Sequence, residues 1–129
     1  MVETVYHSNS PDPMLKSFLH GKIHRARVTH VALDYEGSLS VDADLLAAAG
    51  IGDHEQIHVV NLRNGARFVT YAILAPAGSG MIQVNGAAAH LNEVGDLVII
   101  FAYALVNEAE AATLTPTVIY VDENNRPRA

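Results

Sequence analysis

Hydrophobic positions along the chain fall into short stretches separated by turn residues. Polar and apolar residues partly alternate from Leu15 to His30, which is typical of a strand with two different faces. The most apolar stretch, Leu97 to Val106, follows Gly95-Asp96 and predicts a buried strand. Further strands are expected at four other stretches: 56–62, 66–75, 81–85 and 117–121.

Turn and capping residues define the boundaries of these elements. Asn64-Gly65 lies between two expected strands and is the strongest short signal for a β-hairpin. Asp42 to Gly50 predicts a short helix, because aspartate can cap its start and glycine can end it. A second short helix is expected at 108–114. Many short strands separated by turns indicate a small closed barrel, although the pattern alone does not choose among barrel topologies.

Composition narrows the class of protein. The 129 residues suffice for one domain, and half are apolar with no Trp and three Phe, so Val, Ile, Leu and Ala must form most of the core. Cysteine is absent, which fits a reducing cytoplasm. No apolar run reaches the ~20 residues that span a bilayer. Residues 1–13 read as a flexible extension without the apolar stretch of a signal peptide, so we expect a cytoplasmic protein with no membrane partner.

Charge is unevenly distributed along the chain. The formal net charge of −6 argues against nucleic acid as a partner. Half of the eight basic residues lie within residues 13–33, a stretch without acidic residues: Lys16, Lys22, Arg25 and Arg27. Such a group is either a solvated strand face or a source of positive potential that attracts a small anionic substrate. No spacing of His, Asp and Glu indicates a metal site, and we interpret His24 and His30 as solvated or hydrogen-bonded side chains.

The dipeptide Gly37-Ser38, within Tyr35-Glu36-Gly37-Ser38, is a candidate site of self-cleavage. A serine hydroxyl can attack the preceding carbonyl and convert the amide into an ester. Elimination then releases the new C-terminus, and hydrolysis of the resulting dehydroalanine leaves a pyruvoyl group. Glycine on the acyl side leaves the path of attack open. A Gly-Ser dipeptide on its own is more often an ordinary turn.

Five motifs in order change that interpretation: Gly21–Arg25, Tyr35–Ser38, Asn64–Arg67, Thr70–Ile73 and Val84–His90. With this order and spacing, the chain resembles the pyruvoyl-dependent aspartate 1-decarboxylase family over residues 14–122. The resemblance implies a mainly β fold, a six-stranded double-psi β-barrel with short helices over residues 14–129. It also implies a homotetramer with each active site at a subunit boundary.

The resemblance further implies roles for individual residues. Cleavage between Gly37 and Ser38 would give a β chain, residues 1–37, and an α chain, residues 38–129, whose Ser38 becomes the pyruvoyl group that forms a Schiff base with the substrate. The threonine of the motif, Thr70, polarises the carbonyl at the cleavage point, and Tyr71 protonates the carbanion after decarboxylation. Neighbouring strand residues point to opposite faces, and the sequence does not say which of the two faces the site.

Substrate contacts are implied in the same way. Lys22 and Arg67 match residues that bind substrate carboxylates, a role that suits a guanidinium because it can hold a carboxylate bidentately. Free backbone N–H groups after a strand make an anion site, and small residues let a ligand approach closely. The residues of this kind are Asn85, Gly86, Ala87 and Ala88, and the resemblance makes Thr70 a further substrate contact. Neither a metal nor pyridoxal phosphate is expected.

Two departures from the family pattern bear on processing and on the substrate pocket. Ala32 stands where the family commonly has aspartate, and Asp34 could substitute if the strand continues to it. Val60 stands where some members have tryptophan and Ala66 where some have lysine, both at variable positions.

The expected function is conversion of L-aspartate to β-alanine and CO₂ for pantothenate and coenzyme A synthesis. The alternatives are a pyruvoyl decarboxylase for another small acidic amino acid, or an unprocessed barrel that acts as a binding or scaffold protein. Whether a maturation factor is required stays open.

Overall fold

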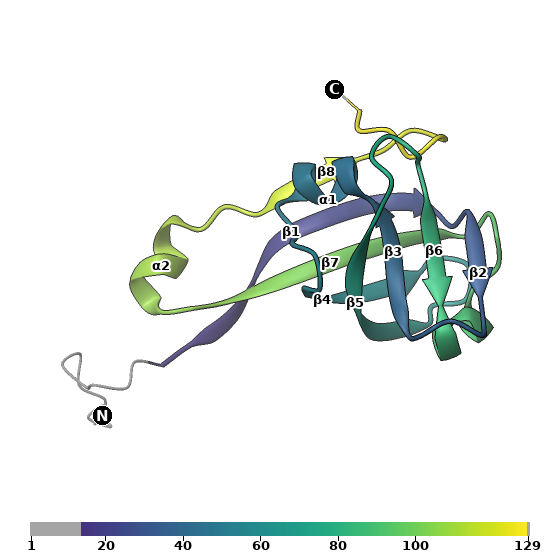
Figure 1. Cartoon of the computed structure of the whole chain (residues 1–129). Helices are drawn as coiled ribbons and strands as arrows, with labels where there is room; N and C mark the ends of the chain where they lie inside the picture. The colour runs from purple at the N-terminus through teal and green to yellow at the C-terminus, as the bar shows by residue number, and fades with distance from the viewer. Residues whose placement is uncertain (1–13, 129) are drawn as a thin grey trace.

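The computed structural model describes residues 14–128 (Figure 1), and the extension expected over residues 1–13 lies outside them. The elements of the described residues, in chain order, are β1 (Lys16–Arg27), β2 (His30–Ala32), β3 (Ser38–Asp42), α1 (Ala43–Ala49), β4 (Gln56–Asn61), β5 (Arg67–Ala75), β6 (Ile82–Asn85), the 3-10 helix η1 (Gly86–Leu91), β7 (Leu97–Val106), α2 (Glu108–Thr113) and β8 (Thr117–Tyr120). None of the helices in residues 14–128 is long and apolar enough to cross a membrane.

The strands form a closed ring, and the closure lies at the junction between β1 and β2. Within residues 14–128 the eight strands are ordered β2-β6-β3-β5-β4-β7-β1-β8. Only Val28 and Thr29 separate β1 from β2, although the two strands lie near opposite ends of this order. At that junction the Val28 N–H donates to Asp96 O and the Thr29 N–H to Ile82 O, both at 2.8 Å. The strand order therefore begins at β2 and comes back to β1, which is continuous with β2, so the sheet closes into a barrel.

The closed ring has six members when β1 and β2 are taken as one bent strand, and β8 lies outside it, parallel to the other edge of β1. Two pairs in the ring are parallel, β2–β6 and β3–β5, and the antiparallel pair β3–β6 lies between them. In chain order, the first three ring members are β1 with β2, β3 and β4, and the last three are β5, β6 and β7. If each of the first three is exchanged with its counterpart among the last three, the pattern of parallel and antiparallel pairs stays the same. This symmetric arrangement is a double-psi barrel, so the predicted fold class is confirmed.

Alternation along the strands builds the core from small and branched aliphatic residues, as composition requires. The fully buried residues on the inner faces include Leu39, Val41, Ile57, Val59, Ala72, Ile82, Val84, Val98 and Ile100. Helix α1 covers the barrel with Leu45 and Leu46. Its start and end are those predicted, because Asp42 accepts from the Asp44 N–H at 2.9 Å and Gly50 has a left-handed φ of 71°.

Two sequence predictions on strands need correction. The strand expected from Leu15 to His30 is interrupted at the ring-closing junction, where the backbone changes partner from β7 to β6. Ser38, interpreted from the sequence as a residue in a turn, is the first residue of β3, and the turn precedes it at residues 33–37. The hairpin at Asn64-Gly65 joins β4 and β5 as expected.

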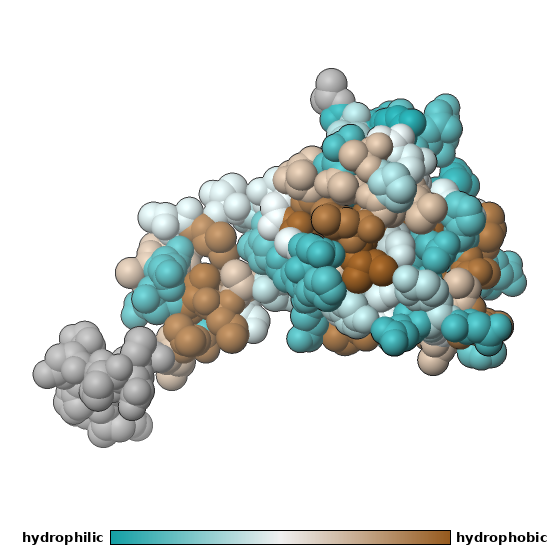
Figure 2. Space-filling model, viewed as in Figure 1, coloured by the Kyte–Doolittle hydropathy of each residue, from teal (hydrophilic) through white to brown (hydrophobic). Residues whose placement is uncertain are grey.

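A two-stranded arm projects from the barrel, formed by the start of β1 and the end of β7 together with α2 (Figure 1). Its surface is hydrophobic in part, as the same view in Figure 2 shows. Exposed apolar side chains on the arm include Leu15, Phe18 and Leu105, which are 52%, 38% and 68% exposed. Such a surface is typical of a contact with another protein chain.

Candidate active site

Ser38 is held by polar side chains at the start of β3. It is only 2% exposed and pairs directly with Asn85 on β6. The Asn85 amide donates to Ser38 Oγ at 2.9 Å and to Ser40 Oγ at 3.0 Å, while Gln83 Nε2 donates to Asn85 Oδ1 at 2.7 Å. The Ser38 hydroxyl donates to Glu36 O at 3.3 Å. These contacts fix the hydroxyl next to the Gly37 peptide and leave its oxygen with a single strong donor.

Gly86 packs against the turn that leads into the peptide that would be cut. Its φ is 76°, and a Cβ added there would lie 2.8 Å from Gly37 Cα and 3.1 Å from Tyr35 O. Only glycine fits this approach, because a side chain would displace the turn and the left-handed backbone would be strained. By contrast, a Cβ added at Gly37 would meet no atom within 4 Å. Space is therefore open at Gly37 on the side away from Gly86.

The register between β3 and β5 decides which face Thr70 and Tyr71 occupy. Leu39 pairs with Ala72 in a parallel ladder, and both are fully buried in the barrel. One residue earlier on each strand, Ser38 and Tyr71 therefore share the outer face. Thr70 shares the inner face with Ala72 and pairs with buried Ile57. The structure thus resolves the alternative that the sequence left open.

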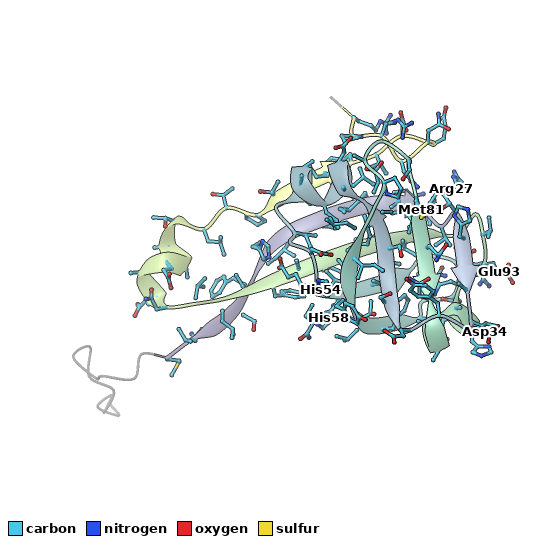
Figure 3. The ribbon with its side chains drawn as sticks, in the orientation of Figure 1. Arg27, Asp34, His54, His58, Met81 and Glu93 are labelled. Carbon is cyan, nitrogen blue, oxygen red and sulfur yellow. The ribbon has the colours of Figure 1, made fainter. Side chains whose placement is uncertain are left out.

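A histidine that sequence reasoning missed covers Tyr71. The rings of His54 and Tyr71 are stacked, with centroids 5.9 Å apart and planes 10° apart. The His54 N–H donates to Ala72 O at 2.7 Å, and His54 has a positive φ of 69°. Figure 3 labels His54 and His58, which lie on the β4–β5 side of the barrel. No sequence signal marks His54, because a positive φ at a histidine depends on the contacts of the loop.

Lys22 and Arg67 meet over one aromatic ring on the outer face. Lys22 Nζ lies 5.5 Å and Arg67 Cζ 5.3 Å from the centroid of Phe101. Arg67 Nη2 also donates to the Tyr103 hydroxyl at 3.3 Å. The prediction that β7 is simply a buried strand is therefore wrong for six of its ten residues. Val98, Ile100 and Ala102 are buried, whereas the alternate residues face outward and carry these rings.

Charges around Lys22 are not balanced locally. Among residues 14–128, neither Lys22 nor Arg67 takes part in an ion pair. The pKa of His24 is lowered by burial and then by the positive charges of Lys22 and Arg25, which favours the neutral imidazole. The face is thus positive, as expected for a site that binds an anion.

The remaining predicted residues lie at different distances from Ser38. Asn85 and Gly86 contact the turn directly, whereas Ala87 and Ala88 follow along η1, exposed and half-buried respectively. No hydrogen bond or ion pair within residues 14–128 joins the Ser38 group to Lys22 or Arg67. In residues 14–128, no three His, Asp or Glu side chains are grouped as a metal would require.

The departure at Ala32 lies beside the candidate site. Ala32 pairs with Asn85 in the β2–β6 ladder, so the missing carboxylate would stand next to the amide that contacts Ser38. Strand β2 ends at Ala32, and Asp34 lies exposed in the following turn (Figure 3). The condition under which Asp34 could substitute, a continuing strand, is therefore not met.

The fold and these residues define a class: a double-psi barrel with an exposed glycine joined to a buried serine, and with two cations on the same outer face. Residues 14–128 match the family described as Aspartate decarboxylase, and the chain belongs to that family. It is 57% identical over 113 residues to Aspartate 1-decarboxylase of Methylococcus capsulatus, with 88% of this chain and 90% of the relative covered.

A second relative and a solved structure are also similar. The chain is 58% identical over 113 residues to Aspartate 1-decarboxylase 2 of Gloeobacter violaceus, with 88% of this chain and 90% of that protein covered. Among solved structures, the rationally designed mkDPBB_sym_86 protein is similar at 20% identity with a TM-score of 0.43, covering 69% of this chain and 96% of the designed one. The family assignment from the five motifs is confirmed by the relatives.

Proposed function

We propose that this chain cuts itself between Gly37 and Ser38 and then converts L-aspartate to β-alanine and CO₂. The family supports the reaction, which is that of a carboxy-lyase. The observation that carries the proposal is the geometry at Ser38, with Asn85 donating to its hydroxyl and Gly86 packed under Gly37. This arrangement fits a serine that is to become a pyruvoyl group, because the hydroxyl is positioned and the acyl side is open.

Self-cleavage would use Ser38 on the outer face of the barrel wall and Thr70 on the inner face. Ser38 Oγ attacks the Gly37 carbonyl carbon, the amide C–N bond breaks, and an ester replaces it. Asn85 orients the hydroxyl through its 2.9 Å hydrogen bond. The family motif assigns Thr70 to the carbonyl oxygen, where a hydrogen-bond donor stabilises the charge that develops during attack. Gly86 keeps the turn in the geometry that this attack requires.

Decarboxylation would use the outer face. The pyruvoyl group supplies a carbonyl that condenses with the substrate amine and takes up electrons as CO₂ leaves. Lys22 and Arg67 bind carboxylate groups of the substrate, and Gly86, Ala87 and Ala88 contact it through the backbone. Tyr71 donates a proton to the substrate carbon after CO₂ has left, a role for which a phenol is suited because it keeps its proton at neutral pH.

We further propose a homotetramer in the cytoplasm, with each active site at a subunit boundary. The hydrophobic arm supports an assembly, since it leaves Phe18 and Leu105 uncovered in a single chain. β-Alanine from the reaction would feed pantothenate and coenzyme A synthesis. A maturation factor could assist cleavage, and Ala32 beside Asn85 is the feature that favours such a need.

One experiment tests both halves of the proposal. The mass of the purified protein is expected to show two pieces, residues 1–37 and 38–129, and the cleaved protein is expected to release CO₂ from aspartate in preference to glutamate and neutral amino acids. A chain that stays whole and inactive would instead be an unprocessed binding or scaffold protein. Cleaved protein that prefers glutamate would be a pyruvoyl decarboxylase of another acidic amino acid.

A further inference from the structure

The two cations of the candidate site share one support. Phe101 pairs with Lys22 across β1–β7 and with His58 across β4–β7, and both of its neighbours along β7 are fully buried. Its ring therefore lies on the outer face between β1 and β4. Lys22 reaches it from the adjacent strand, with Nζ 5.5 Å from the centroid. Both the distance and the position are those of a cation–π contact.

Arg67 approaches the same ring from farther away. It starts on β5, pairs with Val60 on β4, and crosses that strand to bring Cζ within 5.3 Å of the Phe101 centroid. Two strand spacings amount to roughly 10 Å, a span that an arginine can cover only when extended. The ring holds a guanidinium that would otherwise be free to move over the barrel surface.

Tyr103 adds a second point of attachment for Arg67. Its hydroxyl accepts from Arg67 Nη2 at 3.3 Å, and its ring stacks with Phe101 at 6.5 Å. The ring of His58 meets the Tyr103 ring edge-on at 5.1 Å. Arg67 is thus fixed by a ring face and by one hydroxyl. No other side-chain hydrogen bond of Arg67 is formed within residues 14–128, so the rest of its donors are left for a ligand.

We propose that Phe101 is a positioning residue that fixes the spacing of Lys22 and Arg67 and thereby selects a short dicarboxylate. The proposal rests on the proposed function, in which these two cations bind substrate carboxylates. Both charges lie within contact of one centroid, so they are at most about 11 Å apart, the sum of the two distances. A fixed separation of the two cations matches one length of diacid best, and an acid of another length shifts its α-carbon away from the reacting position.

The test is binding of succinate, a dicarboxylate without an amine, to uncut Ser38→Ala protein by calorimetry. This readout needs no cofactor and no activity. Phe101→Leu keeps an apolar side chain but removes the ring face, and it is expected to weaken succinate binding on the order of 10-fold. Phe101→Tyr keeps the ring face and is expected to stay within about threefold of the parent. Phe18→Leu, the same change on the arm, is the matched control.

Activity of the cleaved protein gives the second readout. Phe101→Leu is expected to raise KM for aspartate by a similar factor, to leave kcat within about twofold, and to reduce the preference for aspartate over glutamate. Unchanged succinate binding and unchanged preference in a folded Phe101→Leu protein would overturn the inference, and so would an equal loss in Phe101→Tyr. If succinate binding to Ser38→Ala protein depends on Phe101 as expected but the wild-type protein releases no CO₂ from aspartate, the proposed function fails while the role of Phe101 stands.

Discussion

Ser38 and Arg67 face the same side of the barrel wall, yet their surroundings differ in almost every respect. Ser38 is 2% exposed and enclosed by Asn85, Gln83 and the close backbone of Gly86. Arg67 is exposed and rests on Phe101 without an acidic partner in the described residues. A bond within the chain can be cut only where the reacting groups are fixed beforehand. Capture of an anionic substrate is favoured where positive charges are left without acidic partners.

The largest effect is expected from removing the hydroxyl of Ser38, the reacting group of the buried region. Ser38→Ala should abolish cleavage and activity completely, because no hydroxyl remains to attack Gly37. Intact mass gives the answer directly. The control is Ser79→Ala at the other Gly-Ser dipeptide, where Ser79 Oγ only accepts from the Met81 N–H at 3.2 Å. Cleavage of the Ser38→Ala chain at this bond would rule out the mechanism.

Gly86→Ala perturbs the turn before Ser38 and leaves the Ser38 hydroxyl itself unchanged. The new Cβ would lie 2.8 Å from Gly37 Cα, so most of the protein is expected to remain uncut. Gly65→Ala is a matched control, since Gly65 has a φ of 72° and open space around its Cβ. Both variants carry the cost of a left-handed alanine, about 1–2 kcal/mol, but only Gly86→Ala moves the turn. Equal cleavage in the two variants would contradict the role given to Gly86.

Tyr71→Phe separates turnover from processing. It is expected to leave cleavage intact and to lower kcat by on the order of 10²-fold or more, as the loss of a general acid does. Thr70→Val, on the inner face, should instead block cleavage while the barrel still folds. Measuring cleaved fraction and kcat for both variants decides the assignment. If Thr70→Val is processed normally and Tyr71→Phe is not, the two roles are exchanged.

Arg67→Ala tests the exposed side. Because Arg67 has no structural ion pair in the described residues, folding and cleavage should be unaffected while kcat/KM for aspartate falls by about 10- to 100-fold. Arg128→Ala serves as the control for losing an exposed arginine. A large drop in melting temperature for Arg67→Ala would show that the residue serves the fold rather than the substrate.

The smallest effect is expected at Asp96, a charged residue that belongs neither to the buried Ser38 region nor to the exposed Arg67 region. Arg63, together with Asn61, lowers the pKa of Asp96 to about 2. A lowered carboxyl pKa stabilises the fold above pH ~4, and that contribution is lost as the pH falls towards 2. Asp96→Asn should therefore reduce the free energy of unfolding by about 2 kcal/mol at pH 7, with little change in cleavage. The difference from wild type in thermal melts should shrink between pH 4 and pH 2, whereas Glu123→Gln should change little throughout.

Local signals in the sequence predicted local structure well. Asp42 and Gly50 bound α1 as expected, since capping depends on residues within one helical turn. Two of the five motifs, Tyr35–Ser38 and Val84–His90, likewise contain residues that the structure brings together, among them Ser38 and Asn85. Strand β3 was missed because its short polar-apolar alternation begins at a glycine-serine pair that is typical of a turn.

Features that depend on strand pairing could not be predicted. Phe101 looks like a core residue within the apolar stretch of β7, and only its register against Lys22 shows that it faces outward. The position of Ala32 beside Asn85 depends on a parallel pairing between segments about fifty residues apart. Which face Thr70 and Tyr71 each occupy could be decided only from the pairing of Leu39 with Ala72.

The bent strand that closes the ring also determines what a cut after Gly37 would do. Residues up to Gly37 contribute one ring member, β1 with β2, and the later residues contribute the other five. Neither piece can complete the barrel without the other. The mature protein would then be two chains interlocked by backbone pairing, which migrate together in native conditions and separate only when the fold is lost. The break frees an exposed turn and no strand, so maturation would change the covalent structure while leaving the architecture in place.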